Sequence, residues 1–302
     1  MNVLIVGLGS IAQKHIKALW RIDSSIKIYA FRSSAKSKCV EGVTDLFSLT
    51  EIVPDFFDFA IISTPTSEHL KSILFLYRLN IPLFIEKPLY HELSIQKVVE
   101  EIRDKGLLTY VACNLRFLDA LNFVKQRITE LNLRINEVNV YCGSYLPDWR
   151  KGIDYKENYS AIPELGGGVH LDLVHEIDYI YWMFGNPVHA QKQFSNSSSL
   201  SIKSYDYANY CLDYGDYNVS IVLNYYRRDA RRSLELVCET ETIYADLLEN
   251  KVSVNGQNLF KSNESIADTY EKQLRYFIQC MREGKQTFNT ITDAYNVLQI
   301  CL

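Results

Sequence analysis

An aspartate and a histidine three positions apart follow a run of three glycines, and this combination predicts a substrate site. The run is Gly166 to Gly168, and the pair is Asp172 and His175. Residues three apart on a helix share a face, so both side chains are expected to point into one cleft behind a flexible glycine hinge. His175 exchanges a proton near neutral pH, while Asp172 orients it or accepts a substrate hydroxyl. The predicted chemistry is proton transfer to or from a bound substrate.

The same segment contains His170, which allows a second interpretation as a zinc site. His170, Asp172 and His175 are of the residue types that bind zinc. No further ligand follows nearby, and the seven cysteines include no Cys-x-x-Cys pair. We therefore expect no metal and interpret His170 as a substrate contact.

A second candidate group is a lysine at the end of an apolar run. Leu83 to Ile85 is followed directly by Glu86, Lys87 and Pro88. The proline disfavours helical backbone at Lys87, so the strand is expected to end sharply with the ammonium projecting over the sheet edge. Oxidation of a secondary alcohol, or reduction of a ketone, needs a polar group that holds and exchanges the hydroxyl proton. Lys87 fits that role, and the alternative is a surface Glu-Lys pair before a turn.

A glycine-rich turn near the N-terminus predicts a dinucleotide as the partner in this chemistry. It follows the apolar run Val3 to Val6 and consists of Gly7, Leu8, Gly9, Ser10, Ile11 and Ala12. In this pattern the glycines let the backbone approach a pyrophosphate, and the N-terminus of the next helix faces its negative charge. Such turns also join strands to helices for steric reasons alone, but the place at the first strand-to-helix turn favours a cofactor.

The end of the second predicted strand bears on the choice between NAD and NADP. An acidic side chain there would bind the ribose 2'-hydroxyl of NAD, and this chain has none at that place. Arg32, Ser33 and Ser34 instead supply a guanidinium and two hydroxyls, with Lys36 and Lys38 following. These groups suit a 2'-phosphate by charge and geometry. The sequence therefore favours NADP over NAD, unless Arg32 only stacks on the adenine or faces solvent.

The third predicted strand, Phe59 to Ile62, ends in a polar turn. Ligands of open α/β sheets lie outside the carboxyl ends of the strands, so Thr64 and Pro65 are expected to line the dinucleotide. A helix that starts at the following hydroxyl residues is compatible with that role. We interpret His69 in the same turn as structural.

The elements that position these residues show two different patterns. Up to about residue 114, short apolar strands alternate with amphipathic helices, an order that produces parallel strands joined by right-handed crossovers. After residue 116, one helix is followed mostly by strands of alternating polarity, with a hairpin turn at Asn255-Gly256 and a further helix near residues 270–281. We predict an α/β protein with a Rossmann doubly wound parallel sheet in residues 1–115 and an α+β domain with a mostly antiparallel open sheet in residues 116–302.

The predicted strands of the first domain are Val3 to Val6, Ile26 to Phe31, Phe59 to Ile62, Leu83 to Ile85 and Leu108 to Cys113. A helix between the last two is predicted from Ile95, Val98, Val99 and Ile102, which recur at helical spacing ahead of Gly106.

Composition and charge exclude several classes of protein. The chain has 302 residues, of which 47% are hydrophobic, and this is sufficient for two domains with separate cores. A net charge of -4 gives no electrostatic reason to expect nucleic acid or an anionic membrane as a partner. The densest basic cluster, Arg227 to Arg232, is interpreted as a solvated loop between strands or as a contact with a charged ligand.

Cysteine usage and the N-terminus bear on location. Seven cysteines are an odd number without paired spacing, which fits a reducing cytosol. The chain has no basic leader and no run of about 18 apolar residues. We therefore expect a cytoplasmic protein that is neither secreted nor membrane-spanning.

The glycine turn, Glu-Lys-Pro and the Asp-His segment, in this order, resemble the glucose-fructose oxidoreductase and inositol dehydrogenase (Gfo/Idh/MocA) family over nearly the whole chain. The resemblance implies an N-terminal Rossmann domain and a C-terminal open-sheet domain that also mediates oligomers. It further implies that the lysine of Glu-Lys-Pro acts with a downstream aspartate and histidine, here Lys87, Asp172 and His175. The Glu-Lys-Pro segment, with Glu86 and Lys87, is implied to contact the dinucleotide, as are the glycine turn and the Thr-Pro turn.

Two further segments extend the resemblance. Asn114 and Arg116 lie in a stretch similar to the family's connection between its two domains, whose polar side chains reach the nicotinamide or the substrate. Trp149, Arg150 and Tyr155 resemble a subgroup associated with surface-carbohydrate biosynthesis. Aromatic rings stack on sugars and arginine binds carboxylate or phosphate, although a packed loop would also explain Trp149.

Together these features predict an NAD(P)-dependent oxidoreductase that acts on a hydroxyl or keto carbon of a sugar, polyol or nucleotide sugar. Lys87 would contact the reacting hydroxyl, His175 would exchange its proton and Asp172 would position it. We expect a homo-oligomer, either a dimer or a tetramer, although the chain stops at Leu302 within a predicted helix and its C-terminal edge is expected to be trimmed. Two alternatives are a non-catalytic dinucleotide-binding regulator and a sugar lyase or hydrolase that oxidises its substrate transiently.

Overall fold

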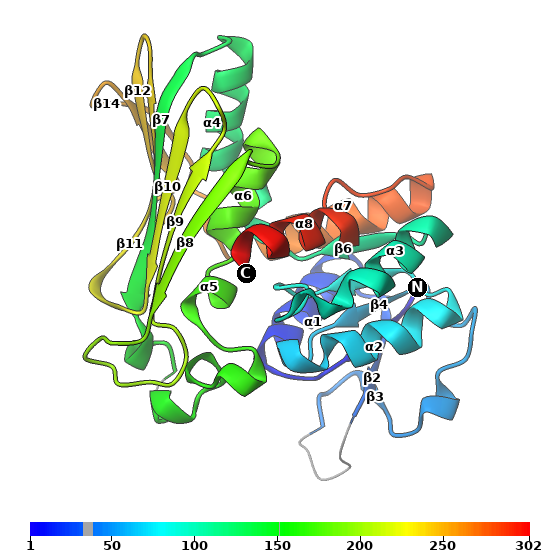
Figure 1. Ribbon diagram of the computed structural model, residues 1–302. Helices are drawn as coiled ribbons and strands as arrows, with labels where there is room; N and C mark the ends of the chain where they lie inside the picture. Colours follow the sequence, from blue (N-terminus) through cyan, green and yellow to red (C-terminus); the bar gives the residue numbers. More distant parts are fainter. Residues whose placement is uncertain (33–38, 151) are drawn as a thin grey trace. The chain divides into compact units, whose positions relative to one another are not determined.

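The computed structural model describes residues 1–32, 39–150 and 152–302 (Figure 1). The chain forms two compact units. Unit 1 comprises residues 1–113 and 270–299, and unit 2 comprises residues 114–269 and 300–302. The candidate cofactor residues Ser33 and Ser34, together with Lys36 and Lys38, lie outside the described residues.

Unit 1 contains a parallel sheet of six strands in the order β3-β2-β1-β4-β5-β6. The strands are β1 (Asn2–Val6), β2 (Lys27–Phe31), β3 (Val43–Leu46), β4 (Phe59–Ile62), β5 (Leu83–Ile85) and β6 (Thr109–Val111). The strand order reverses between β1 and β4, which is where doubly wound sheets bind ligands. The predicted Rossmann sheet is confirmed. Strand β3 is absent from the prediction because its four residues are half polar and have no clear period.

The helices of unit 1 are α1 (Ser10–Ile22), α2 (His69–Leu76), α3 (Gln96–Lys105) and most of α7 (Thr269–Glu283) and α8 (Ile291–Cys301). Helix α3 is the one predicted from apolar spacing, and its positions Val98, Val99 and Ile102 are buried. It ends at Gly106, whose φ of 68° is the left-handed conformation that glycine adopts without strain.

Helix α7 belongs to unit 1 from Tyr270 onward, whereas the division expected from the sequence assigns it to the second domain. Its apolar side packs on the parallel sheet, because the ring of Phe277 lies 5.1 Å from that of Phe59 and 5.6 Å from that of Phe84. The helical period of this segment identifies the helix but does not reveal which of the two sheets receives its apolar face.

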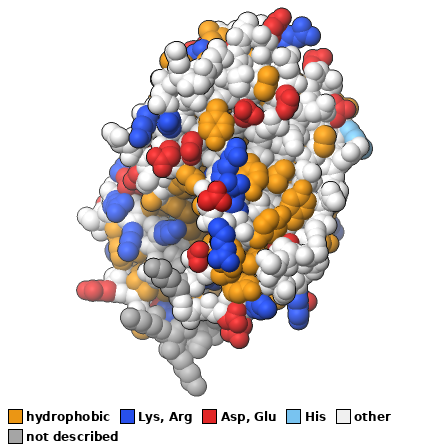
Figure 2. Space-filling model, turned by 90° about the vertical axis from the view of Figure 1, so that its left-hand side faces the viewer, with side chains coloured by type: hydrophobic (Ala, Val, Ile, Leu, Met, Phe, Trp, Pro, Cys, Tyr) orange, Lys and Arg blue, Asp and Glu red, His pale blue; other side chains and the backbone are white. Residues whose placement is uncertain are grey.

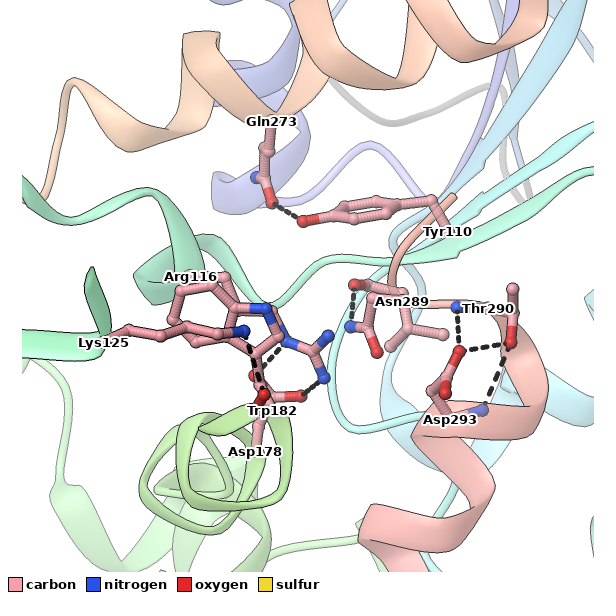
Figure 3. Close-up of polar contacts among 10 residues, drawn as sticks. Tyr110, Arg116, Lys125, Asp178, Trp182, Gln273, Asn289, Thr290 and Asp293 are labelled. Carbon is pink, nitrogen blue, oxygen red and sulfur yellow. Dashed lines mark hydrogen bonds and ion pairs between the residues drawn. The ribbon is translucent and has the colours of Figure 1, made fainter. Parts of the chain in front are cut away.

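The segment between α7 and α8 extends the edge of the same sheet. Asn289 donates its side-chain amide to the carbonyl of Val111 at 2.7 Å, and its own carbonyl accepts from the Val111 amide at 3.0 Å (Figure 3). Asp293 accepts from the amide and the hydroxyl of Thr290 at 2.9 and 2.5 Å, which caps α8. The chain therefore returns to β6 after more than half its length.

Unit 2 contains an eight-stranded sheet in the order β14-β13-β12-β11-β7-β10-β9-β8. Strands β7 and β10 pair in parallel and the other neighbours pair antiparallel. The strands are β7 (Ile135–Tyr145), β8 (His189–Ser195), β9 (Tyr207–Asp213), β10 (Asn218–Asn224), β11 (Tyr226–Cys238), β12 (Thr242–Asp246), β13 (Lys251–Val254) and β14 (Gln257–Lys261). Helices α4 (Asp119–Glu130) and α6 (His175–Phe184) lie on one face of this sheet (Figure 1). The predicted mostly antiparallel open sheet is confirmed.

One turn and one strand of unit 2 bear on the sequence interpretation. Asn255 and Gly256 both have positive φ, 49° and 79°, as a two-residue hairpin requires. The basic cluster from Arg227 to Arg232 lies within β11, so its interpretation as a loop is wrong. A shift in pairing between Tyr226 and Arg231 marks a β-bulge there, and the alternation of strand residues was hidden by the run of charges.

Among the described residues no helix covers the second face of this sheet, which mixes aromatic and basic side chains (Figure 2). Arg228 lies 3.9 Å from the ring centroid of Tyr145, and Arg231 lies 5.3 Å from that of Tyr141. Tyr226 is 37% exposed at the end of the same strand. Stacking of guanidinium on aromatic rings explains how several arginines share one strand.

Candidate active site

The carboxyl ends of β1 and β4 border a cavity in unit 1 with a volume of about 540 Å³. Four predicted cofactor residues line it, namely Gly7, Arg32, Thr64 and Pro65. Apolar side chains from Leu49, Ile52, Phe75 and Leu76 complete much of the wall. A largely apolar cavity with a few polar groups at the switch point of a doubly wound sheet is suited to the adenosine half of a dinucleotide.

Gly7 is required by the close approach of two turns. Its φ is 91°, and a Cβ there would lie 2.6 Å from the amide nitrogen of Thr64 and 2.8 Å from the carbonyl oxygen of Ser63. The Ser63 hydroxyl also donates to the Gly7 carbonyl at 2.7 Å. The turn after β1 is thus packed directly on the turn after β4.

Gly9 has a different environment. It precedes α1 in extended backbone, and a Cβ at this position would meet no atom within 4 Å. Ser10 and Ile11 form the first turn of α1, where backbone N–H groups are available to an anion, while Ala12 is fully buried and packs in the core. The open space at Gly9 therefore suits a pyrophosphate against the helix N-terminus.

Arg32 lines the cavity, but one of its nitrogens is already paired. Its Nη1 donates to Oδ1 of Asp45 at 2.8 Å, and both side chains are largely buried. Asp45 belongs to β3, the strand that the sequence did not reveal. Lys71, an exposed residue of α2, is a second cation in the lining. Lys71 was not predicted as a cofactor residue, because it is distant from Arg32 in the sequence and only the fold brings both to the same cavity.

The turn after β4 contains an unsatisfied polar atom. Within the described residues, the buried Oγ1 of Thr64 has no hydrogen-bond partner. Buried hydroxyls are nearly always satisfied, so this atom is available to a bound ligand or to water. Together with the space at Gly9, this observation shows that the residues present fit a dinucleotide.

His69 connects this turn to the one after β5. Its Nε2 lies 3.0 Å from the carbonyl oxygen of Thr64, and its Nδ1 lies 3.2 Å from that of Leu89. Burial lowers the pKa of His69 below its usual value. These contacts agree with the structural interpretation of this residue.

Glu86 faces the inside of unit 1. Its Oε1 lies 2.5 Å from Nε2 of His15, which is fully buried on α1, and its Oε2 accepts from the Lys87 amide at 3.2 Å. The carboxylate therefore connects α1 to the end of β5. These bonds are internal, and they do not include the contact with the dinucleotide that the family resemblance implied. The sequence offered no signal for His15, since one histidine on a helix has many possible environments.

Lys87 follows β5 directly, as expected, and its side chain is half-buried. The Lys87–Pro88 peptide bond is cis. Strand β5 lies beside β4, whose carboxyl end borders the cavity. Lys87 thus emerges at the same edge of the sheet as the cofactor residues.

In unit 2, Asp172 is held by two tyrosines. The hydroxyl of Tyr159 donates to Oδ1 at 2.7 Å, and that of Tyr225 donates to Oδ2 at 2.5 Å. Asp172 is 5% exposed and Tyr225 is fully buried. Burial, and then the charge of Asp172, raise the pKa of both phenols, so each remains protonated and donates. Neither tyrosine was predicted, because both come from segments without a recognisable motif.

Asp172 and His175 lie on two consecutive helices and not on one as predicted. Asp172 ends α5 (Val169–Asp172), and His175 begins α6. Leu173, with φ of -99° and ψ of 31°, breaks the helix between them. The whole segment is buried, so packing determines the backbone here more than helical spacing does.

The glycines before α5 are closely packed, which corrects the expectation of a flexible hinge. A Cβ at Gly167 would collide with the carbonyl oxygen of Tyr159, and one at Gly168 would lie 2.6 Å from Cε1 of His170. Gly168 also has a φ of 136°. Glycine is needed at these two positions because the backbone of Tyr159 lies against Gly167 and the ring of His170 lies against Gly168.

Trp149 and Arg150 both pack on the tyrosines that hold Asp172. The Trp149 ring lies 5.3 Å from that of Tyr225 at 86°, and its Nε1 donates to the Ser144 hydroxyl at 2.9 Å. The guanidinium of Arg150 lies 5.0 Å from the ring centroid of Tyr159. Both predicted substrate residues are thus brought to the neighbourhood of Asp172.

The structure places two other predicted substrate residues elsewhere. The Tyr155 hydroxyl donates to the carbonyl of Leu200 at 3.1 Å. His170 lies against the rings of Phe194 and Tyr205 at 5.2 and 5.4 Å and is 6% exposed. Burial lowers the pKa of His170 to about 4. His170 is therefore a neutral side chain within an aromatic cluster.

Arg116 and Asn114 also make internal contacts. Arg116 donates through Nε and Nη2 to both oxygens of Asp178 at 2.9 and 2.7 Å, and both side chains are 1% exposed (Figure 3). Asn114 donates to the hydroxyl of Thr269 at 2.6 Å. These bonds anchor α6 and the connection to α7, and they leave no open approach for a ligand to the Arg116 fork.

The turn, sheet and cavity of unit 1 are those of a dinucleotide-binding protein, and family comparison identifies the class as an oxidoreductase. Residues 1–113 match the model of the oxidoreductase family with an NAD-binding Rossmann fold, and residues 133–244 match the GFO/IDH/MocA C-terminal domain. The chain belongs to the GFO/IDH/MocA family. It is an NAD(P)-dependent oxidoreductase, as the sequence predicted.

Several solved structures share the fold over 100% of this chain and 95% of their own. A levoglucosan dehydrogenase in complex with NADH and levoglucosan has a TM-score of 0.87 at 14% identity. A myo-inositol 2-dehydrogenase from Lactobacillus plantarum has 0.82 at 18%, and a UDP-N-acetylglucosamine 3-dehydrogenase from Acidithiobacillus ferrooxidans has 0.80 at 14%. A search of curated proteins finds no match to this sequence. None of the described helices combines the length and apolar character needed to cross a membrane.

Proposed function

We propose that this protein transfers a hydride between a nicotinamide and a hydroxyl or keto carbon of a sugar, a polyol or a nucleotide sugar. The observation that carries the proposal is the buried carboxylate of Asp172, which two phenols hold next to the start of α6. Such an arrangement suits an acid-base step on a hydroxyl more than a packing role. The similar structures named above bind or act on levoglucosan, myo-inositol and a UDP-sugar, which supports the substrate class.

In the proposed reaction the dinucleotide, when bound, supplies or accepts the hydride. Lys87 Nζ contacts the reacting oxygen and stabilises negative charge on it. His175 takes the hydroxyl proton during oxidation and returns it during reduction. Asp172 accepts a hydrogen bond from the substrate hydroxyl and positions it.

Replacement of Lys87 tests this assignment. Lys87→Ala should lower turnover by roughly 10²-fold or more, the scale of general acid-base groups. Dinucleotide affinity, measured by fluorescence titration with NADH and NADPH, should remain unchanged. Lys97→Ala, at an exposed position of α3, is the matched control and should retain full turnover. Equal turnover of the two variants on a panel of sugars and nucleotide sugars would refute the role of Lys87.

For the cofactor we propose NADP in preference to NAD. Arg32 and Lys71 place two cations in the lining of the cavity, which also contains the carboxylate of Glu68, and Arg32 is paired with Asp45. Arg32→Ala and Lys71→Ala should each weaken NADPH binding by about tenfold, because a hydrogen bond to a charged group contributes about 1.5 kcal/mol or more. NADH binding should change little. Tighter binding of NADH than of NADPH by the unaltered protein would contradict the proposal.

We further propose a cytoplasmic homo-oligomer, a dimer or a tetramer. The support for oligomers is the face of the eight-stranded sheet that no helix covers, with half-buried Tyr141 and Val222 and exposed Tyr226. Exposed aromatic side chains together with arginines are typical of interfaces. The support for the location is that all seven cysteines are free. Light scattering of the purified protein measures the assembly directly.

A further inference from the structure

We propose that Tyr159 and Tyr225 are positioning residues for the proposed reaction, because they fix the carboxylate of Asp172 in one orientation. The inference rests on the proposed oxidoreductase function and adds two residues that the sequence motifs do not contain. It concerns unit 2 alone. Its basis is the geometry around a single buried carboxylate.

The two phenols donate to different oxygens of the carboxylate. Tyr159 donates to Oδ1 and Tyr225 donates to Oδ2, at 2.7 and 2.5 Å. A carboxylate has about four acceptor positions, and the two phenols use one position on each oxygen. With one bond on each oxygen, rotation about the bond to the carboxyl carbon is blocked. The remaining lone pairs therefore keep one direction.

The tyrosines reach Asp172 from two separate parts of the chain. Tyr159 lies in the connection between β7 and α5, and Tyr225 lies between β10 and β11. The backbone of Tyr225 is itself held, since its amide donates to the Asp206 carbonyl at 3.0 Å and its carbonyl accepts from the Leu146 amide at 2.8 Å. Movement of the carboxylate would thus require movement of two anchored segments.

A comparison within unit 2 shows that a buried phenol does not need a carboxylate. Tyr210 is also fully buried, and its hydroxyl donates to the backbone carbonyl of Cys301 at 3.1 Å. Burial of a tyrosine therefore does not by itself explain why two phenols donate to the same carboxylate. They are what a carboxylate needs if it is to stay charged and fixed inside the protein.

The same tyrosines link Asp172 to the predicted substrate loop. Trp149 packs edge-on against Tyr225 at 5.3 Å, and Arg150 lies over Tyr159 at 5.0 Å. Each tyrosine thus has Asp172 at its hydroxyl and one loop residue on its ring. A sugar that contacts Trp149 and Arg150 would therefore contact side chains that pack directly on the two tyrosines bonded to Asp172.

The test uses the full-length protein with Tyr159→Phe and Tyr225→Phe, each of which removes one hydroxyl. Tyr210→Phe is the matched control. Each test variant should lower kcat about tenfold, the effect of losing one hydrogen bond to a charged group, with KM changed less than about threefold. The primary deuterium isotope effect on kcat, measured with a sugar labelled at the reacting carbon, should rise because hydride transfer becomes more rate-limiting. A smaller fraction of folded enzyme would lower kcat without changing the isotope effect.

Two results would overturn the inference. If both variants match Tyr210→Phe in kcat and isotope effect while the unaltered enzyme is active, the tyrosines have no positioning role and the proposed function stands. If the unaltered enzyme binds neither dinucleotide and oxidises no sugar of the panel, the proposed function fails and the inference fails with it. Should Tyr225→Phe not fold, Tyr159→Phe decides by the same two readouts, since its ring is only partly buried.

Discussion

At the scale of single residues, the two glycines of the turn after β1 have different functions. Gly7 is fixed by its φ of 91° and by the backbone of Ser63 and Thr64, which leave no room for a Cβ. Gly9 has open space on that side. Gly7 is therefore required for folding, and Gly9 is required to leave space for the ligand.

Alanine at each position separates these functions. Gly7→Ala should destabilise the protein by about 1–3 kcal/mol, the range for strained backbone, in addition to weakening dinucleotide binding. Gly9→Ala should unfold at the same denaturant concentration as the unaltered protein but bind dinucleotide at least about tenfold more weakly, because its methyl occupies the space for the pyrophosphate. Chemical denaturation and fluorescence titration provide the two measurements. Equal stability of the two variants would contradict the assignment.

Single residues also show what sequence can predict. Gly7, Thr64, Pro65 and Lys87 were identified because they stand directly after apolar strands, and the ends of parallel strands meet at one edge of a sheet. Tyr159 and His15 were not identified, because their partners are 13 and 71 residues away and no local sequence pattern indicates such pairs. Local spacing predicts positions along an element, and it does not predict which distant side chains satisfy a buried carboxylate.

At the scale of elements, α6 is held by two buried ion pairs. Arg116 binds both oxygens of Asp178, and Arg232 on β11 donates to Glu176 at 2.7 and 3.3 Å. Glu176 is fully buried. Since His175 begins this helix, the pairs hold the element that carries the imidazole. The sequence marked Arg116 as a substrate contact because a family motif contains it, and only the fold reveals Asp178 as its partner.

Removal of one partner should therefore be costly. Arg116→Met should destabilise the protein by about 3–5 kcal/mol, because the carboxylate of Asp178 would stay buried without compensation. The double variant Arg116→Met with Asp178→Leu should recover much of that loss, since no charge remains. Arg275→Met, which removes a half-exposed pair with Glu271, should change stability by less than about 1 kcal/mol. A loss at Arg116 no larger than that at Arg275 in chemical denaturation would show that the pair does not anchor the helix.

The elements themselves were largely predictable, with three instructive exceptions. Apolar spacing located α3, most of the strands and the Asn255-Gly256 hairpin within a few residues. It missed β3, where polar residues obscure the period, and it read α5 and α6 as one helix. It also assigned α7 to the second domain, whereas the helix belongs to unit 1 from Tyr270 onward, because an amphipathic face packs equally well on either sheet.

At the scale of the whole molecule, two buried histidines make stability depend on pH. Burial lowers the pKa of His170 from 6.5 to about 4 and also lowers that of His69. Below about pH 6.5 the unfolded chain therefore takes up protons that the folded protein does not, and stability falls as the pH falls toward 4. For His170 the full loss is of the order of 3 kcal/mol, reached once both states are protonated.

Denaturation curves between pH 7 and pH 4 measure this effect. His170→Gln, which has no titrating group, should show a flatter decline than the unaltered protein, with the part that His69 causes retained. His189→Gln, at an exposed histidine, should decline as the unaltered protein does. Parallel declines for His170→Gln and the unaltered protein would show that His170 does not stay neutral.

The most direct test of the account follows one hydrogen atom. A sugar that the enzyme turns over is prepared with deuterium on the reacting carbon and incubated with enzyme and oxidised dinucleotide, and the released dinucleotide is examined by mass spectrometry. The account predicts one deuterium on each reduced dinucleotide, formed in equal amount to the oxidised sugar, and almost none with Lys87→Ala. Sugar product that forms while the free dinucleotide stays oxidised and unlabelled would contradict it and would indicate transient oxidation instead.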